Sequence, residues 1–306
     1  MKNIDKLIFL YCYICDCYDR ELSLHYQRMS NNYLPQLTDQ EVLTIFLYCL
    51  LVEKRMSIRT IYDFADNYLR TWFPHLGKTY ESFLVRLNNL SAVFPALIHC
   101  LLEQKSKTMN PEELKQLAQM LFSVVDSMPI IMAKGPRSFT AKVAPNLADK
   151  GFCSSKKLHY YGLKLHVMGF SRFQKLPLPE FVGTSPASHN DLTVFKPLLE
   201  NIQDRVIFGD KIYGNQQLEQ WLEKNNNVHI LTPVKKNKGQ VFLEAADKFY
   251  STIVSQVRLP IESFFNWIIE KTGIQNASKI RSEKGLLLHV YGRFAAAMFS
   301  LTFEGF

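Results

Sequence analysis

The stretch Arg205-Val-Ile-Phe-Gly-Asp210-Lys-Ile-Tyr-Gly-Asn215 decides the fold. Its first part, Val206 to Phe208, is a β-branched and aromatic run that predicts a short buried strand. The run stops at a glycine, and the carboxylate of Asp210 follows directly. An acid at the end of a strand lies near solvent on a rigid sheet, where open α/β sheets bind their ligands. Gly-Asp is also a frequent turn pair, so the stretch alone is equally typical of a simple turn into a helix.

Strand-like runs on both sides of this stretch predict a mixed α/β fold for the later part of the chain. Leu121 to Val125 is such a run, and we expect the strand to end at Asp126. Tyr161 to Met168 alternates between apolar and polar side chains, which predicts a half-exposed strand. The other expected elements are a strand at 180–184, a helix capped by Asn190 or Asp191 that ends at Leu199, a helix at 216–224 capped by Asn215, and a strand at 228–232.

A third carboxylate, Glu262, follows the sequence Arg258-Leu-Pro260. Proline suits the first turn of a helix, so a helix is expected to begin at Pro260. At about 100° per residue, Glu262 lies at the edge of the apolar face of that helix, one turn from Arg258. A surface pair between the two side chains explains this spacing as well. Asp126, Asp210 and Glu262 can nevertheless converge at one end of a mixed sheet.

The chemistry of three convergent carboxylates favours a metal site. Such groups repel one another and take up protons unless cations neutralise them. A set of oxygen ligands without His or Cys favours Mg²⁺ or Mn²⁺. Two such ions, roughly 3.5–4 Å apart, activate a water or a 3′-hydroxyl and stabilise the leaving oxygen of a phosphodiester.

The charge of the chain is compatible with a DNA substrate. The formal net charge is +8, which favours polyanionic partners. Residues 134–175 hold nine Lys or Arg and one acid, Asp149, although a block of this kind is often only a solvated face. A second basic group, Lys235, Lys236 and Lys238, follows the expected strand at 228–232. Both groups are candidate phosphate contacts.

The first hundred or so residues have the pattern of helices. Thr38-Asp-Gln-Glu41 is a capping box, which predicts a helix from Asp39 to about Val52. Ser57 and Thr79 are predicted to cap two further helices. Capped helices with short loops are typical of a helix-turn-helix DNA reader and equally of a plain helical bundle. A polar stretch at 103–119 indicates a boundary between this part and the rest.

The cysteines and the apolar N-terminal run indicate a cytoplasmic protein. The six cysteines lack the paired ligand spacing of a zinc site, so we interpret them as reduced structural thiols. The run from Leu7 to Cys15 is too short to span a bilayer and is expected to form a buried helix. No membrane association is expected.

Five blocks of the sequence, taken in order, resemble bacterial insertion-sequence transposases of the DDE class, and most of all the insertion-sequence family numbered 982. The blocks are Val-Val-Asp126-Ser-Met-Pro129, Tyr-Gly-Leu-Lys164-Leu-His166, Ser188-His-Asn-Asp191, Gly-Asp210-Lys-Ile-Tyr213-Gly and Arg258-Leu-Pro-Ile-Glu262. The chain departs from these relatives at Ile212, where they commonly have glycine.

This resemblance implies a ribonuclease-H-like, mixed-sheet catalytic domain at 118–306 that follows an all-α, helix-turn-helix-like DNA-binding domain at 1–110. It implies that Asp126, Asp210 and Glu262 are catalytic acids that bind two Mg²⁺ or Mn²⁺ ions. The expected substrate is double-stranded DNA, both the element ends and the target, bound by a homodimer or higher assembly in the bacterial cytoplasm at the nucleoid. The expected DNA contacts are Lys164, Lys235, Lys236, Lys238 and Arg258.

Two alternatives remain at this point. A nuclease of the same fold would cut DNA without joining it to a target. A DNA-binding regulator with a decayed active site would do neither, and the presence of all three acids argues against it.

Overall fold

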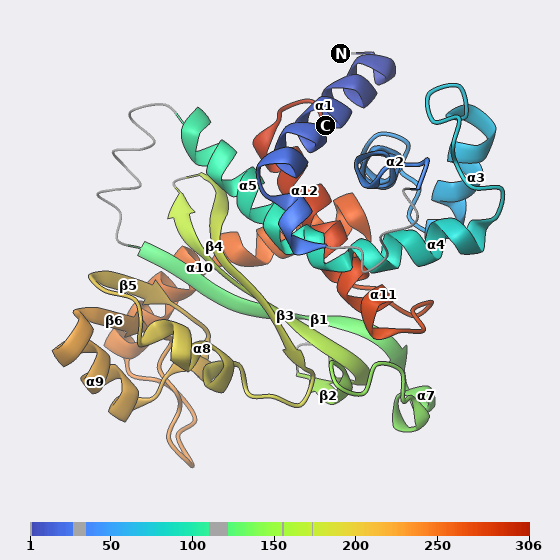
Figure 1. Ribbon diagram of the computed structural model, residues 1–306. Helices are drawn as coiled ribbons and strands as arrows, with labels where there is room; N and C mark the ends of the chain where they lie inside the picture. Colours follow the sequence, from blue (N-terminus) through green and yellow to red (C-terminus); the bar gives the residue numbers. More distant parts are fainter. Residues whose placement is uncertain (1, 27–34, 110–121, 155, 173) are drawn as a thin grey trace. The chain divides into compact units, whose positions relative to one another are not determined.

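The computed structural model describes residues 2–26, 35–109, 122–154, 156–172 and 174–306, which form two compact units. The helical unit comprises residues 1–108 and 268–306, and the sheet unit comprises residues 109–267. The division falls inside one long helix, between Trp267 and Ile268. The elements that the structure describes are shown in Figure 1.

The described elements of the helical unit are α1 (Asn3–Arg20), η1 (Leu22–His25), α2 (Asp39–Leu51), α3 (Ile58–Tyr68), α4 (Tyr80–Asn89), η2 (Leu90–Ala92), α5 (Val93–Thr108), the end of α10 (Ala245–Thr272), α11 (Glu283–Leu287), η4 (Leu288–Gly292) and α12 (Arg293–Thr302). The sheet unit contains β1 (Phe122–Lys134), α7 (Pro136–Thr140), β2 (Asp149–Cys153), β3 (Leu158–Arg172), β4 (Lys175–Pro186), α8 (Asp191–Leu199), β5 (Arg205–Phe208), η3 (Lys211–Tyr213), α9 (Gln216–Asn226), β6 (Val228–Leu231) and most of α10.

The predicted helix caps of the first part are confirmed. The Thr38 hydroxyl accepts a hydrogen bond from the Glu41 amide, and the Glu41 carboxylate accepts one from the Thr38 amide. Ser57 caps α3 and Thr79 caps α4 in the same way, through their hydroxyl oxygens. Each cap satisfies an amide that the first turn of a helix would otherwise leave without a partner.

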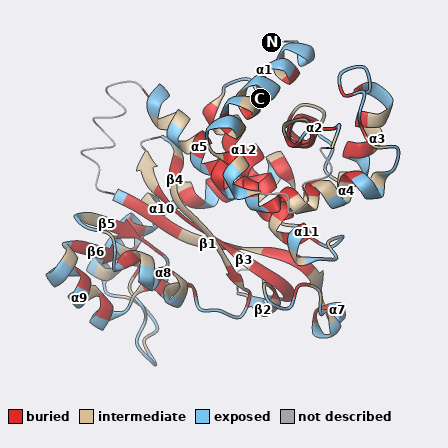
Figure 2. Cartoon of the chain, in the orientation of Figure 1, coloured by how far each residue is buried: buried red, intermediate tan, exposed pale blue. Residues whose placement is uncertain are grey.

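The core of the helical unit is built from both ends of the chain. Helix α2 is buried on almost every side, and so is α12 (Figure 2). The buried Arg293 of α12 donates hydrogen bonds to the backbone carbonyls of Met56 and Thr272. One helical run, 80–108, is long and apolar enough to cross a membrane by length and composition, but 56% of its apolar window is buried inside the protein. Such burial is typical of a core helix.

The sheet unit is organised around one six-stranded mixed sheet. Its order is β2-β3-β1-β5-β6, and β4 pairs with β3 along the part of β3 that β2 does not reach. Strand β1 runs antiparallel to β3 and parallel to β5, and β5 runs parallel to β6. The predicted mixed α/β class is therefore confirmed for this part of the chain.

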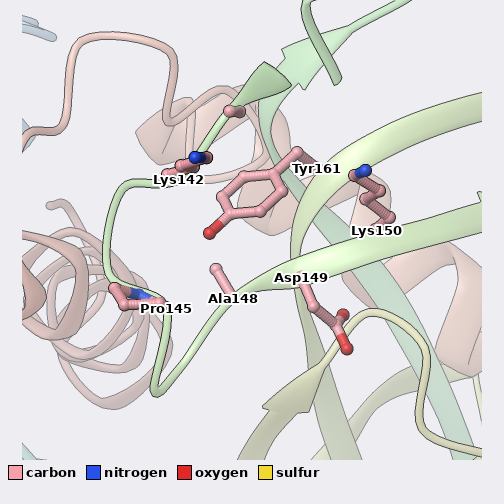
Figure 3. A pocket seen from close by; sticks show the side chains of 7 residues that line it. Lys142, Pro145, Ala148, Asp149, Lys150 and Tyr161 are labelled. Atoms are coloured by element: carbon pink, nitrogen blue, oxygen red, sulfur yellow. The ribbon is translucent and has the colours of Figure 1, made fainter. Parts of the chain in front are cut away.

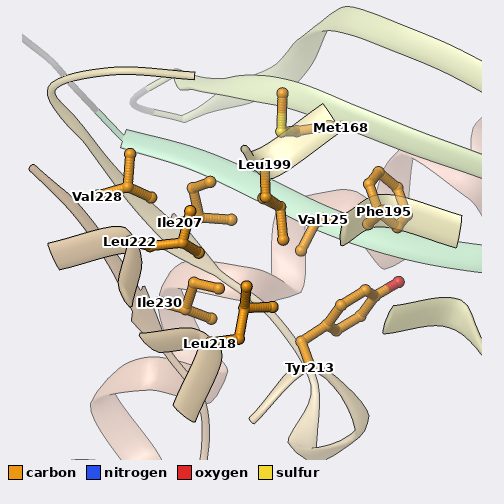
Figure 4. Packing of buried hydrophobic residues seen from close by; sticks show 10 residues of the cluster. All are labelled: Val125, Met168, Phe195, Leu199, Ile207, Tyr213, Leu218, Leu222, Val228 and Ile230. Carbon is orange, nitrogen blue, oxygen red and sulfur yellow. The ribbon is translucent and has the colours of Figure 1, made fainter. Parts of the chain in front are cut away.

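Apolar side chains from β1, β5, β6, α8 and α9 form a core beside the parallel strands (Figure 4). Phe195 of α8 and Tyr213 of η3 are both almost completely buried in it, with ring centroids 5.6 Å apart. Because α8 and α9 follow the strands directly and bury their apolar faces here, this core fixes the loops at the ends of the strands.

The sequence predicted that strand β1 ends at Asp126, and this prediction is wrong. It continues through Pro129 to Lys134, paired with β3 over its whole length. Pairing with β5 stops at Val124, so β1 has an open edge from there on. Proline is tolerated in a strand where one edge is open, and this is why Pro129 does not break β1.

The prediction that a helix begins at Pro260 is wrong. Helix α10 begins at Ala245, and Pro260 lies inside it. Proline removes one backbone hydrogen bond from a helix interior. The helix continues because residues on both sides bury apolar side chains, among them Val254 and Ile261.

Candidate active site

The geometry of two parallel strands brings Asp126 and Asp210 to the same end of the sheet. Val124 of β1 pairs with Phe208 of β5, and each acid lies two residues beyond its member of that pair. Side chains two residues apart on an extended chain point to the same face, and neighbouring strands lie about 4.8 Å apart. The two carboxylates are therefore neighbours at the point where β5 ends beside β1.

Close packing and a backbone hydrogen bond fix the position of Gly209 and Asp210. The Gly209 amide donates to the Leu231 carbonyl of β6, which extends the sheet by one residue. A Cβ atom on Gly209 would lie 2.8 Å from the Tyr213 ring, so a side chain does not fit there. Asp210 is extended, with φ −74° and ψ 167°, at the start of η3. Ile212, which stands where relatives commonly have glycine, is not among the described residues with positive φ, so its backbone does not require glycine.

Arg258 connects the first acid to the third. Its guanidinium donates to Asp126 Oδ2 at 2.7 Å and to Glu262 Oε1 at 2.5 Å. The Asp126 side chain is 20% exposed and that of Glu262 is 46% exposed. The predicted pair between Arg258 and Glu262 is present, and it is part of a bridge between β1 and α10.

Burial raises the pKa of the Asp126 carboxyl to about 6. The Arg258 guanidinium and the Ser127 amide lower this pKa, and the charges of Asp210 and Asp191 raise it. Burial and repulsion therefore outweigh the single cation. A site that keeps this acid ionised needs more positive charge than Arg258 supplies.

The structure adds residues that sequence reasoning did not assign to the site. The Tyr213 hydroxyl is buried and has no hydrogen-bond partner among the described residues. Asp191 lies in the first turn of α8, while Asn190 accepts the capping bond from the Leu192 amide. Asp191 instead forms an ion pair with Lys164 at 2.8 Å. The position of Asp191 one residue after a cap was the available signal, but its partners come from β1 and β3.

A hollow of about 490 Å³ opens beside the acids in the sheet unit. Its lining includes Asp210, Lys211, Lys248 and Arg258, together with hydroxyl and amide side chains of α10. Three cations and several neutral hydrogen-bonding groups around one acid form a surface that suits a polyanion.

The three loop lysines are all exposed. Lys235 donates to the Gly214 carbonyl at 3.1 Å, close in sequence to η3. Lys236 donates to the Val241 carbonyl at 2.7 Å within its own loop. Both ammonium groups are thus positioned by backbone contacts. Lys164, in contrast, has a side chain only 17% exposed, because it is bound to Asp191.

A second hollow, of about 570 Å³, belongs to the basic block at 134–175 (Figure 3). Lys142, Lys150 and Tyr161 contribute to its lining, and none of the three acids does. Tyr161 donates its hydroxyl proton to the Val143 carbonyl. This hollow is separate from the acid site.

Across the residues described, no group of three or more His, Cys, Asp or Glu side chains is arranged to hold a metal ion. None of the six cysteines forms a disulfide. At the acid site, the Arg258 guanidinium lies between two of the carboxylates.

The model of a family described as the transposase DDE domain matches residues 118–299, which is more than half of the chain. No curated protein and no solved structure matches the chain. The matched region contains Asp126, Asp210, Glu262 and Arg258.

Proposed function

Because this chain belongs to the transposase DDE domain family, we propose that it is the transposase of a bacterial insertion sequence. It binds the terminal inverted repeats of its element, hydrolyses a phosphodiester at each end, and joins the freed 3′-hydroxyl groups to target DNA. The observation that carries the proposal is that Arg258 bridges Asp126 and Glu262, while Asp126 and Asp210 lie at equal offsets from the Val124–Phe208 pair, inside the family-matched region.

The donor set fits divalent magnesium or manganese. The three acids supply only carboxylate oxygens, which hard cations prefer. Asp126 is buried with too little positive charge beside it, as its raised pKa reflects. We assign two Mg²⁺ or Mn²⁺ ions to Asp126, Asp210 and Glu262; when bound, such ions supply an activated oxygen nucleophile and neutralise charge on the phosphodiester.

The remaining roles belong to the chain itself. Asp126 and Asp210 are held by the rigid sheet, so their carboxylates keep a fixed separation. Glu262 is the most exposed of the three and is carried by a helix. Arg258 neutralises Asp126 and Glu262 in the free protein and contacts a DNA phosphate once it is released from them. A guanidinium suits both tasks, because it donates two parallel hydrogen bonds to either group.

The proposed DNA contacts extend from the acid site. Lys235, Lys236 and Lys238 contact phosphates near the hollow beside Asp210, and the block at 134–175 contacts phosphates further away. Lys164 belongs to the same proposal, although its ammonium group is bound to Asp191 in the free protein. These contacts position the duplex and are not specific for sequence.

Several finer features belong to the same proposal. The strand order, in which the antiparallel strands β1 to β4 come first in the chain and β5 and β6 then pair in parallel, supports a ribonuclease-H-like catalytic domain at 118–306. The helices of 1–110 form a helix-turn-helix-like reader of the element ends, and residues 268–306 pack with them in the helical unit. The protein acts as a homodimer or higher assembly on DNA in the bacterial cytoplasm, in the manner of the insertion-sequence family numbered 982.

A strand-transfer assay tests the proposal. The substrate is a labelled duplex that carries an imperfect inverted repeat from the DNA next to the gene, with a supercoiled plasmid as target and Mg²⁺ present. Nicking at the repeat end followed by a labelled plasmid product supports a transposase. Nicking without a joined product would support the alternative, a nuclease of the same fold. Specific binding without nicking would support the inactive regulator.

A further inference from the structure

Asp191 is the centre of a buried polar network next to the acid site. Only 8% of the surface of Asp191 is exposed to solvent. One carboxylate oxygen accepts a hydrogen bond from Lys164 at 2.8 Å, and the other accepts one from the Ser127 hydroxyl at 2.9 Å. The Lys164 ammonium group also donates to the His189 carbonyl at 2.8 Å. The network therefore joins the first turn of α8 to β1 and to β3.

This network reaches the first acid through one residue. Ser127 directly follows Asp126, and its amide donates to Asp126 Oδ1 at 2.8 Å. The same residue thus binds Asp191 through its hydroxyl and Asp126 through its amide. Its two bonds hold the peptide that orients the Asp126 carboxylate.

The middle of the same helix contacts a residue that is bonded to the second acid. Phe195 lies one turn after Asp191 on α8 and packs edge-on against Tyr213, with centroids 5.6 Å apart. Tyr213 closes the short turn that begins at Asp210, and its amide donates to the Asp210 carbonyl at 2.9 Å. Helix α8 therefore contacts Ser127, which is bonded to Asp126, and Tyr213, which is bonded to Asp210.

From these contacts we propose that α8 is a brace that sets the position of Asp126 relative to Asp210, and that Asp191 is the positioning residue that locks the brace to β1. The inference rests on the proposed function, since it assigns a task within that acid site. Asp191 does not touch the reacting groups in this scheme. It acts through Ser127, in the way that outer residues orient the direct ligands of a metal.

The same sheet contains a matched control. Ser123 lies four residues before Ser127, on the same face of β1. Its hydroxyl donates to Glu180 at 2.7 Å, and Arg205 donates to both Ser123 and Glu180. The Glu180 and Arg205 side chains are 16% and 17% exposed, close to the 11% and 17% of Asp191 and Lys164. This second network has the same chemistry but contacts no acid of the site.

The experiment compares binding of Mn²⁺ to the full chain, measured as loss of the free-ion signal in electron paramagnetic resonance. We expect Asp191→Asn to raise the half-saturating Mn²⁺ concentration about tenfold or more, which is typical for loss of an orienting partner. Glu180→Gln is expected to lower the melting temperature by a similar amount without this rise. Ser127→Ala and Ser123→Ala form a second matched pair, in which each variant loses only a hydroxyl. This pair still tests the brace if Asp191→Asn does not fold.

The outcomes separate the two proposals. A rise in Asp191→Asn and Ser127→Ala alone supports the brace. The brace is overturned if Asp191→Asn and Glu180→Gln bind Mn²⁺ with equal affinity. The proposed function still stands in that case, provided that the wild type binds Mn²⁺ and that Asp126→Asn abolishes this binding. If the wild-type protein has no Mn²⁺ site that Asp126→Asn weakens, both the brace and the proposed function are overturned.

Discussion

Two positions of strand β1, Ser123 and Asp126, use the same kinds of residue for different results. At Ser123, one acid, Glu180, faces one cation, Arg205, and the charges balance. At Asp126, the same strand meets further carboxylates, and Arg258 is the cation bonded to it. The Ser123 network is balanced in charge, whereas the surroundings of Asp126 have an excess of negative charge.

This difference explains why only Asp126 belongs to a candidate site. An ion pair whose charges balance has no net charge for a ligand to neutralise. A partly buried carboxylate beside other carboxylates raises the free energy of the folded chain unless a proton or a cation neutralises it. Local charge imbalance, and not the presence of acids, therefore distinguishes the surroundings of Asp126 from those of Ser123.

The strongest test of the comparison is removal of single carboxylate charges. We expect Asp126→Asn, Asp210→Asn and Glu262→Gln each to lower the rate of DNA nicking by at least about 10³-fold, because loss of a ligand charge removes several kcal/mol of transition-state stabilisation. Binding of the element-end duplex, measured by gel shift, should change little. Glu180→Gln is the control and should retain nicking within a few-fold. Nearly normal nicking in any of the three variants would remove that acid from the site.

A second test replaces each of the two arginines, Arg258 and Arg205, with glutamine. Arg258→Gln leaves Asp126 without its cation, and loss of one partner of a buried pair costs about 3 kcal/mol. We expect added Mn²⁺ to restore the melting temperature of this variant, since the ion replaces the missing positive charge. Arg205→Gln should be destabilised similarly and should gain no more from Mn²⁺ than the wild type gains. Equal responses of the two variants would contradict the charge-imbalance argument.

The raised pKa of Asp126 gives a third, smaller effect. Asp126 binds a proton more tightly in the folded chain, where its pKa is about 6, than in the unfolded chain, where it is about 3.9. The stability from this proton is present at low pH and is lost as the pH rises through about 6. Without metal, Asp126→Asn should therefore gain stability relative to the wild type over this range, on the order of 1–3 kcal/mol. Melting temperatures of both proteins between pH 4.5 and 7.5, at about equal ionic strength, measure the difference; a difference independent of pH would rule out ionisation of Asp126 in this range.

The smallest expected effect concerns the exposed lysines. Replacement of Lys235, Lys236 or Lys238 by alanine should reduce the slope of log affinity against log salt by about one for each lost phosphate contact. Lys224 on α9, which is exposed and lies outside the proposed DNA contacts, provides the control. A slope that stays the same in the loop variants would identify these lysines as ordinary solvated surface.

The sequence predicted the place of Asp210 after a strand better than it predicted the bounds of the elements that carry Asp126 and Glu262. Asp210 was predictable because a buried strand, a glycine and a carboxylate follow one another, and all three are local features. The extent of β1 was not, since Pro129 is tolerated only because pairing with β5 stops at Val124. The start of α10 was missed for a related reason. Proline is frequent in the first turn of a helix, and only tertiary packing shows that Pro260 lies inside one.

The contacts of Asp191 illustrate the limit of sequence reasoning. Its neighbour Asn190 caps α8 as predicted, so the pattern there is fully explained by local structure. The partners Lys164 and Ser127 are 27 and 64 residues away in the chain. Pairing across such distances depends on strand register, which single-residue patterns do not determine. The packing of residues 268–306 with the first helices belongs to the same class of long-range information.

The pairing of Val124 with Phe208 also bears on how this site can change during evolution. Asp126 and Asp210 stand at equal offsets from that pair, on chains whose side chains alternate in direction. Insertion or deletion of one residue between Phe208 and Asp210 would turn the carboxylate to the opposite face, whereas a substitution leaves its direction unchanged. Lineages that retain activity should therefore vary this segment in composition but not in length.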